Sequence, residues 1–321
     1  MNEAHVVFGA NGALGAAIVR RLTADGKPVR AVVRDADLAA VLLPPTAGVV
    51  VKDARVKDMA VDACQGAAVV YYCINVPYAL WPRWMPTITD NILAAAGQAG
   101  ASLVFPGNVY GYGPLQSIPA TEEHPLAAKS SKGQLRNAME RRLMRAHEAG
   151  DVPTVIPRFP DFYGPNVINK LMAPIFQSAL KGARAAWPGS LDVPHDLVFV
   201  DDAAAACVLL GATREAYGQA WHVPGAGPLT GRQFLEMAFR AAGTAPRGGT
   251  MGRLMFRFLG LLAPEAREML ELLYQFEEPM LLDGGKFARA FPDFRYTPHE
   301  DAVRQTVEWF RQNPLENAPL A

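Results

Sequence analysis

The sequence predicts an α/β protein built on a doubly wound parallel sheet, with a smaller, mostly helical C-terminal cap. Two observations predict this fold. Short apolar runs alternate with helix-like segments through the first half of the chain, a pattern typical of parallel strands covered by helices on both faces. A glycine-rich turn, Gly9 to Gly15, joins the first apolar run to the first helix-like segment. Such a turn indicates a sheet of the Rossmann type.

The expected elements of the first half follow from this alternation. Strands are expected at His5–Gly9, Val29–Val33, Gly48–Lys52, Ala68–Ile74, Leu103–Pro106 and Thr154–Arg158. Helices are expected between them, at Ala13–Asp25, around Met59–Cys64, at Met85–Ala99 and at Lys132–Ala149. Several of the strands are apolar throughout, as buried parallel strands are.

The pattern changes after Gly164, where helix-like segments dominate. Helices are expected at Ile168–Lys181, Thr230–Ala242, Leu254–Tyr274 and Pro298–Asn313, with strand-like pieces at Leu197–Val200 and Ala220–Val223. We therefore divide the chain into a dinucleotide-binding domain, residues 1–165, and a cap, residues 166–321, that forms most of the substrate site. A segment at about residues 195–212 is expected to return to the first domain.

Composition excludes several classes of protein. Of the 321 residues, 50% are hydrophobic and 19% are charged, which is a globular composition. The 31 basic and 31 acidic residues cancel, which argues against a nucleic-acid partner. Apolar stretches are interrupted before they could cross a bilayer. The first strand begins too close to the initiator Met for a signal peptide. We expect a cytoplasmic protein with no membrane contact, either a monomer or a homodimer.

Cysteine usage gives no sign of a metal site. Cys64, Cys73 and Cys207 lie in apolar runs and lack the spacing of metal ligands. We expect reduced, buried thiols and no bound metal.

The glycine-rich turn carries the first functional prediction. Gly9 turns the chain out of the strand, Gly12 lets the backbone approach a pyrophosphate, and Gly15 allows close helix–strand packing. The helix that begins with Ala13 and Leu14 offers free N–H groups to the phosphates, and Asn11 lies within the turn. An ordinary tight turn is the alternative, but the strand before it and the amphipathic helix after it favour dinucleotide binding.

The end of the second expected strand bears on the choice of dinucleotide. NAD-binding folds often place an acidic residue there for the ribose hydroxyls, but this chain has Val33 followed by Arg34. A guanidinium matches a 2′-phosphate in charge and in geometry, so NADP is predicted, with NAD possible because Asp35 is adjacent. After the third strand, Asp53 and Ala54 are placed to contact the adenine, although Asp53 could equally form a turn.

Three further segments resemble one known family. They are Val109-Tyr110-Gly111, Arg158-Phe159-Pro160-Asp161-Phe162-Tyr163-Gly164-Pro165 and Phe199-Val200-Asp201-Asp202-Ala203. In this order and spacing they resemble the short-chain dehydrogenase/reductase superfamily, on its extended or atypical branch, the NAD-dependent epimerase/dehydratase family. The resemblance runs nearly end to end. It implies a nicotinamide dinucleotide, hydride chemistry, and cofactor contacts at Phe159 and Phe162.

The chain departs from that family where the chemistry is done. The family has a tyrosine and a lysine in a YxxxK helix and a Ser or Thr four residues before the VYG tyrosine. Here Lys132 stands at the tyrosine position, Arg136 at the lysine position, and Pro106 replaces the hydroxyl residue. The usual Ser-Tyr-Lys mechanism cannot be carried over.

Lys132 and Arg136 share one helix face because they are four residues apart. Arg136 could bind the nicotinamide ribose, and Lys132 could protonate a substrate oxygen if its pKa falls, or polarise a carbonyl as a fixed cation. The alternative is two solvated charges, with Arg136 paired to Glu140 by the same spacing.

Polar residues at strand ends are the other candidates. Tyr110 could donate the proton, as could Tyr112 or Tyr163, although a packed aromatic is the commoner role. Asn108 and Asn75 follow strands and could contact ligand or cap a turn. His195 could line the substrate site or make a structural hydrogen bond.

These observations predict an NAD(P)-dependent oxidoreductase that acts on a small, partly apolar carbonyl or alcohol, with Lys132, Tyr110 and Asn108 as catalytic candidates. An epimerase or dehydratase without net redox change is one alternative. A non-catalytic dinucleotide sensor is the other, because both the Ser and the Tyr are missing.

Overall fold

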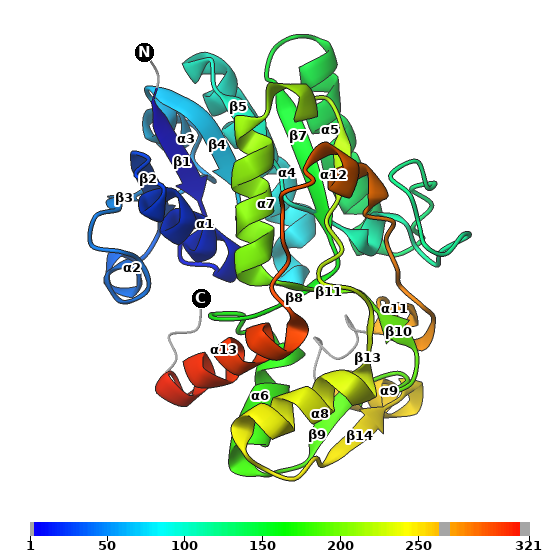
Figure 1. The fold of residues 1–321 in the computed structure, drawn as a ribbon. Helices are drawn as coiled ribbons and strands as arrows, with labels where there is room; N and C mark the ends of the chain where they lie inside the picture. Colours follow the sequence, from blue (N-terminus) through cyan, green and yellow to red (C-terminus); the bar gives the residue numbers. More distant parts are fainter. Residues whose placement is uncertain (1–2, 263–269, 315–321) are drawn as a thin grey trace.

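The computed structural model describes residues 3–262 and 270–314. Its centre is a parallel sheet of eight strands in the order β12-β7-β5-β4-β1-β2-β3, with β6 paired to β7 beside that path (Figure 1). The strands are β1 Ala4–Phe8, β2 Val29–Val33, β3 Gly48–Val51, β4 Ala67–Tyr72, β5 Ser102–Val104, β6 Gly107–Asn108, β7 Thr154–Phe159 and β12 Ala220–His222. The predicted α/β fold of Rossmann type is confirmed.

Helices cover both faces of the sheet (Figure 1). Helices α1 and α7 pack together on one face, and α3, α4 and α5 pack on the other. Their bounds are α1 Ala13–Ala24, α3 Lys57–Cys64, α4 Trp81–Ala99, α5 Ser131–Glu148 and α7 Val200–Ala212. The central strands β1, β4 and β7 are buried between the two helical layers, which explains their apolar sequences.

The cap lies beyond the carboxyl ends of the main strands, around α6 Met172–Lys181, α8 Gly231–Ala242 and α13 His299–Gln312 (Figure 1). Three two-stranded sheets, β10-β13, β11-β8 and β14-β9, join its loops. Their strands are β8 Asp161–Tyr163, β9 Ala185–Pro188, β10 Pro194–His195, β11 Leu197–Phe199, β13 Leu229–Thr230 and β14 Gly248–Met251. The cap is mostly helical, as predicted, but most of these short strands had no sequence signal because two to four residues are too few for a period.

The remaining elements are short. They are α2 Ala36–Leu42, α9 Arg253–Leu262, α11 Tyr274–Glu277, α12 Gly285–Ala290 and the 3₁₀ turns η1 Tyr78–Leu80, η2 Val109–Gly111 and η3 Arg214–Ala216. Helix α2 was not predicted from the sequence, and α4 begins at Trp81, four residues before the predicted start at Met85. Pro82 lies in the first turn of α4, where proline is tolerated, whereas Pro86 lies inside the helix.

The helix expected over Leu254–Tyr274 was wrong at its C-terminal end. Helix α9 ends at Leu262 and a separate short helix, α11, begins at Tyr274. The part of the prediction on residues 263–269 lies outside the described residues.

The returning segment is longer than the sequence suggested. Helix α7, which lies near the C-terminal end of residues 195–212, packs on α1 and the main sheet. Strand β12 also returns and pairs with β7, with Ala220 opposite Ile156. In the described ranges, no helix is both long and apolar enough to cross a bilayer.

Candidate cofactor and substrate site

The glycine turn has the geometry of a phosphate cradle. Gly9 has φ +76°, and a Cβ there would lie 2.8 Å from the carbonyl carbon of Cys73. A Cβ on Gly15 would lie 2.2 Å from the Gly9 oxygen, so the crossing of β1 and α1 requires glycine. At Gly12 a Cβ would meet nothing closer than the Gly9 oxygen at 3.3 Å. Internal packing therefore constrains Gly12 less strongly than Gly9 and Gly15.

The N-terminus of α1 is open toward this turn. Gly12 is its N-cap and no side chain caps the helix, which leaves the first N–H groups, at Ala13 and Leu14, to another partner. The Asn11 side chain donates to the Asp35 carbonyl at 2.9 Å and braces the turn against the end of β2. These features fit a pyrophosphate at the start of α1.

The end of β2 carries one engaged acid and one exposed cation. The Asp35 carboxylate accepts a hydrogen bond from the Leu38 N–H at 3.0 Å and so caps α2. Arg34 is exposed, and its guanidinium has no hydrogen bond or ion pair with the described residues. Its charge reaches Asp53, whose pKa it helps to lower. This guanidinium is therefore open to contact with a 2′-phosphate.

The turn after β3 is held by a hydrogen bond between two of its own side chains. Asp53 accepts hydrogen bonds from Arg55, whose side chain holds the pKa of Asp53 below its usual value. Ala54 is buried, and its carbonyl accepts from the Asn91 amide at 2.9 Å. Asp53 thus has a structural partner in Arg55, and the adenine contact expected for it stays a prediction.

Lys132 is a buried cation and not a solvated one. Only 5% of its side chain is exposed, its ammonium donates to the Glu271 carboxylate at 2.9 Å, and it lies 5.1 Å from the centre of the Tyr78 ring. Burial raises the pKa of Glu271, but hydrogen bonds from Lys132 and Ser131 lower it by more, so Glu271 is ionised. The ion pair favours the ammonium form of Lys132 over the neutral amine.

Arg136 is likewise buried. Its Nη2 donates to the Pro106 carbonyl at 2.7 Å, and its guanidinium lies 4.8 Å from the Phe105 ring. Its Nε is buried without a hydrogen-bond partner among the described residues. The alternative pairing with Glu140 was wrong, because Glu140 forms a buried ion pair with Arg158 at 2.7 Å. Arg136 therefore keeps hydrogen-bonding capacity at the site.

Tyr110 faces Tyr78 beside these cations. Their hydroxyls lie 2.9 Å apart, and burial raises the pKa of Tyr110 well above its usual value. Asn108 accepts from the Tyr110 N–H at 3.1 Å and caps η2, which is the turn-capping role weighed for it. Asn75 is exposed and accepts from the Trp81 indole N–H at 2.9 Å.

Asp161 is a site residue that the sequence analysis overlooked. It begins β8, at the carboxyl edge of the main sheet, and burial raises its pKa to about 6. Its charge raises the pKa of both Tyr78 and Tyr110, so it lies within electrostatic reach of their hydroxyls. No hydrogen bond or ion pair joins its carboxylate to the described residues. Its place directly after a buried strand was the available signal.

Two other tyrosines are taken out of the site by their partners. Tyr112 is fully buried and accepts a hydrogen bond from Arg158 at 2.8 Å, while its hydroxyl also meets His222. Tyr163 is fully buried with its hydroxyl 2.7 Å from Nδ1 of His299. Neither hydroxyl is available as the proton donor considered for it.

The two phenylalanines predicted as cofactor contacts lie together just after the main sheet. Phe159 is fully buried, whereas Phe162 is half-buried, and their ring centres lie 5.4 Å apart. Phe162 is therefore the one that a ligand could touch.

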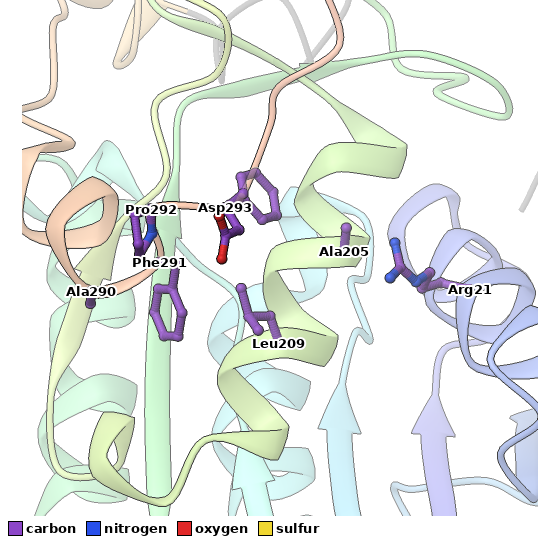
Figure 2. A pocket seen from close by; sticks show the side chains of 8 residues that line it. Arg21, Ala205, Leu209, Ala290, Phe291, Pro292 and Asp293 are labelled. Carbon is purple, nitrogen blue, oxygen red and sulfur yellow. The ribbon is translucent and has the colours of Figure 1, made fainter.

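A separate hollow of about 370 Å³ lies between α1, α7 and the loop after α12 (Figure 2). Arg21, Leu209 and Phe291 are among its lining residues. Arg21 lies in the last turn of α1, at the far end of that helix from the glycine turn. This hollow is not part of the cofactor site.

The fold is of the Rossmann type, and its glycine-rich turn lies between β1 and α1. The model of the NAD dependent epimerase/dehydratase family matches residues 5–223, more than half of the chain. The chain belongs to that family, which is a family of enzymes. Its name agrees with the nicotinamide dinucleotide predicted from the sequence. Among proteins of curated function, none matches the sequence significantly.

Solved structures agree on the fold. The dTDP-glucose 4,6-dehydratase DesIV of Streptomyces venezuelae, with NAD and TYD bound, is 21% identical with a TM-score of 0.79, over 99% of this chain and 100% of that chain. The UDP-glucose 4-epimerase of Thermus thermophilus, in complex with NAD, is 22% identical with a TM-score of 0.77, over 97% and 99%. The enzyme WbmH of Bordetella bronchiseptica, in complex with NAD⁺, is 19% identical with a TM-score of 0.77, over 97% and 99%.

Proposed function

We propose that this enzyme is an NADP-dependent oxidoreductase that reduces a small, partly apolar carbonyl compound or oxidises the corresponding alcohol. The observation that carries the proposal is the buried Lys132 ammonium, held between Glu271 and the Tyr78 ring at the position of the family's catalytic tyrosine. A desolvated cation there suits an oxygen that gains negative charge during reaction.

The preference for NADP rests on Arg34. Its exposed guanidinium is unpaired among the described residues, whereas the neighbouring Asp35 carboxylate is engaged as the cap of α2. A 2′-phosphate would gain a charge-assisted hydrogen bond from Arg34. A ribose 2′-hydroxyl would have to compete with Leu38 for Asp35.

The chain's own residues divide the remaining work. The bound nicotinamide dinucleotide supplies or takes up the hydride. Lys132 polarises the substrate oxygen as a fixed cation, because its ion pair with Glu271 favours the charged form. Arg136 offers its unpaired Nε to the nicotinamide ribose. Asn108 holds the turn that carries Tyr110.

The proton is best assigned to Asp161. Tyr110 has its pKa raised well above 10, so it ionises poorly but can hydrogen-bond. Asp161, with a pKa of about 6, can both hold and release a proton near neutral pH. Asp161 would hold the exchanging proton within electrostatic reach of the Tyr110 and Tyr78 hydroxyls.

An epimerase or dehydratase without net redox change is the second candidate, and membership of the epimerase/dehydratase family favours it. In that case the same Lys132 cation would stabilise an intermediate carbonyl, and the hydride would return to the substrate. Stoichiometric loss of NADPH absorbance with a carbonyl substrate would decide for the oxidoreductase. Conversion of an alcohol substrate in the presence of NADP⁺, with no net formation of NADPH, would decide for the alternative. In either case we expect a cytoplasmic enzyme, a monomer or a homodimer.

The cofactor part is tested by calorimetric titration with NADPH and NADH. We expect tighter binding of NADPH, and Arg34→Ala should remove most of the difference. Arg214→Ala is the matched control, because Arg214 lies in η3 at the opposite edge of the sheet, near the start of β7. Equal affinities for the two dinucleotides in the parent protein would refute the NADP preference.

The catalytic part is tested with Lys132→Met on a panel of small carbonyl compounds, followed by NADPH absorbance. We expect NADPH affinity to be kept and turnover to fall at least tenfold, about 1.4 kcal/mol of transition-state stabilisation. Unchanged turnover would move the role from Lys132 to Tyr110 or to water.

A further inference from the structure

Asn166 has an unusual backbone conformation where the chain passes from β8 into the cap. Its φ is +62°, in the left-handed region, and no other non-glycine residue of the described ranges has a positive φ. A Cβ crowds the backbone in this conformation, so glycine is the residue that adopts it most easily. An asparagine at such a position indicates that its side chain has a task, and residues of this kind concentrate at functional sites.

The Asn166 side chain contacts the glycine turn, 155 residues earlier in the chain. Its amide Nδ2 donates to the Asn11 carbonyl at 3.1 Å, and only 7% of Asn166 is exposed. Asn166 lies between β8, which carries Asp161 and Phe162, and α6, the first helix of the cap. This hydrogen bond therefore joins the start of the cap to the turn that follows β1.

The peptide group that accepts this bond begins the phosphate cradle. The Gly12 N–H, on the other side of the same peptide, donates to the Gly9 carbonyl at 3.0 Å. Both polar atoms of the planar Asn11–Gly12 peptide are thus held, so its orientation is fixed. Gly12 is the N-cap of α1, and the uncapped N–H groups of Ala13 and Leu14 come directly after it.

This peptide needs a second point of attachment because of Gly12. A glycine has no Cβ and tolerates a wide range of φ and ψ, so the residue that lets a phosphate approach also loosens the turn. N–H groups bind an anion best when they are oriented before it arrives, because ordering them on binding subtracts from the affinity. The Asn166 amide supplies this order from outside the turn.

We propose that Asn166 is a positioning residue for the cofactor: its amide orients the Asn11–Gly12 peptide and, through it, the N–H groups that receive the pyrophosphate. The proposal deepens and rests on the proposed function, since it assumes that a dinucleotide binds at this turn. It adds a residue from the start of the cap to a phosphate site that otherwise consists of the first β–α unit.

Calorimetric titration of Asn166→Gly with NADPH tests this role. Glycine keeps the left-handed backbone and removes the amide, so we expect the Kd to rise at least fivefold, the equivalent of one hydrogen bond of about 1 kcal/mol. Asn169→Ala is the matched control in the same segment, because Asn169 accepts from the Met172 N–H at 2.7 Å and caps α6. It should lower the melting temperature and leave the Kd for NADPH within twofold of the parent.

Adenosine 2′-phosphate, which lacks the pyrophosphate, separates positioning from general damage to the site. Its affinity for Asn166→Gly should stay within twofold of the parent, because its phosphate is expected at Arg34 and not at the start of α1. An equal loss of affinity for both ligands would overturn the proposal, and so would an unchanged Kd for NADPH. If Asn166→Gly does not fold, Asn166→Asp replaces it and should show the same split, because an ionised carboxylate has no donor.

The parent protein separates this role from the proposed function. If the parent binds NADPH normally and Asn166→Gly binds it equally well, the positioning role alone is rejected. If the parent binds no NADPH, the proposed function is rejected, and the role of Asn166 with it.

Discussion

The glycine turn allows folding and cofactor binding to be separated by two neighbouring substitutions. Gly15→Ala puts a methyl group 2.2 Å from the Gly9 oxygen, far inside van der Waals contact, so β1 and α1 must move apart. Overpacking of this kind costs about 1–3 kcal/mol. Gly12→Ala meets only the same oxygen at 3.3 Å, which a small shift relieves, so we expect at most about 1 kcal/mol at this N-cap position.

Gly12→Ala should lower cofactor affinity much more than it lowers stability. If a pyrophosphate lies against the start of α1, the methyl of Gly12→Ala occupies its approach, and the Kd for NADPH should rise at least tenfold, about 1.4 kcal/mol. Thermal unfolding measures stability, and calorimetric titration measures affinity. Gly252→Ala, where a Cβ would have nothing within 4 Å, is the control for both. Should Gly12→Ala bind NADPH as tightly as the parent, the turn does not receive the pyrophosphate.

Two further predictions concern buried charges. Because burial raises the pKa of Asp161 from 3.8 to about 6, the folded state holds its proton more tightly than the unfolded state, and the free energy of unfolding should fall as the pH rises from about 4 to 6. This loss of unfolding free energy is up to about 3 kcal/mol. Urea titrations at several pH values between about 4 and 6 measure it, and Asp161→Asn should abolish the pH dependence. The same pH dependence in the variant and the parent would contradict the raised pKa of Asp161. Glu140→Gln should destabilise the fold by about 3–5 kcal/mol, because it leaves Arg158 buried without its carboxylate. Glu300→Gln, which breaks an exposed pair with Arg240, should cost under about 0.5 kcal/mol, and similar losses for both would remove the argument from burial.

Local patterns were sufficient for the sheet and the cofactor turn. The strands of the main sheet are short apolar runs, and Gly9 and Gly15 are required by contacts within the first β–α unit and its neighbouring strand. Arg34 follows β2 directly, so its position at the carboxyl edge could be predicted from the strand alone. Elements of two to four residues, such as β8 and β10, could not be predicted because such lengths carry no periodicity.

The sequence by itself determined the Rossmann sheet and the glycine-rich turn, because each depends on residues that are neighbours in the chain. It also shows Lys132 and not a tyrosine at the motif position. Only the tertiary structure decided the environment of Lys132. Lys132 is a buried cation because Glu271, 139 positions later, packs against it. Glu140 forms its ion pair with Arg158 on β7, because α5 packs against that strand. It does not pair with Arg136, although Arg136 lies only four residues before it in the chain. Burial and long-range pairing set the charge state of a side chain, and neither can be read from its neighbours in the chain.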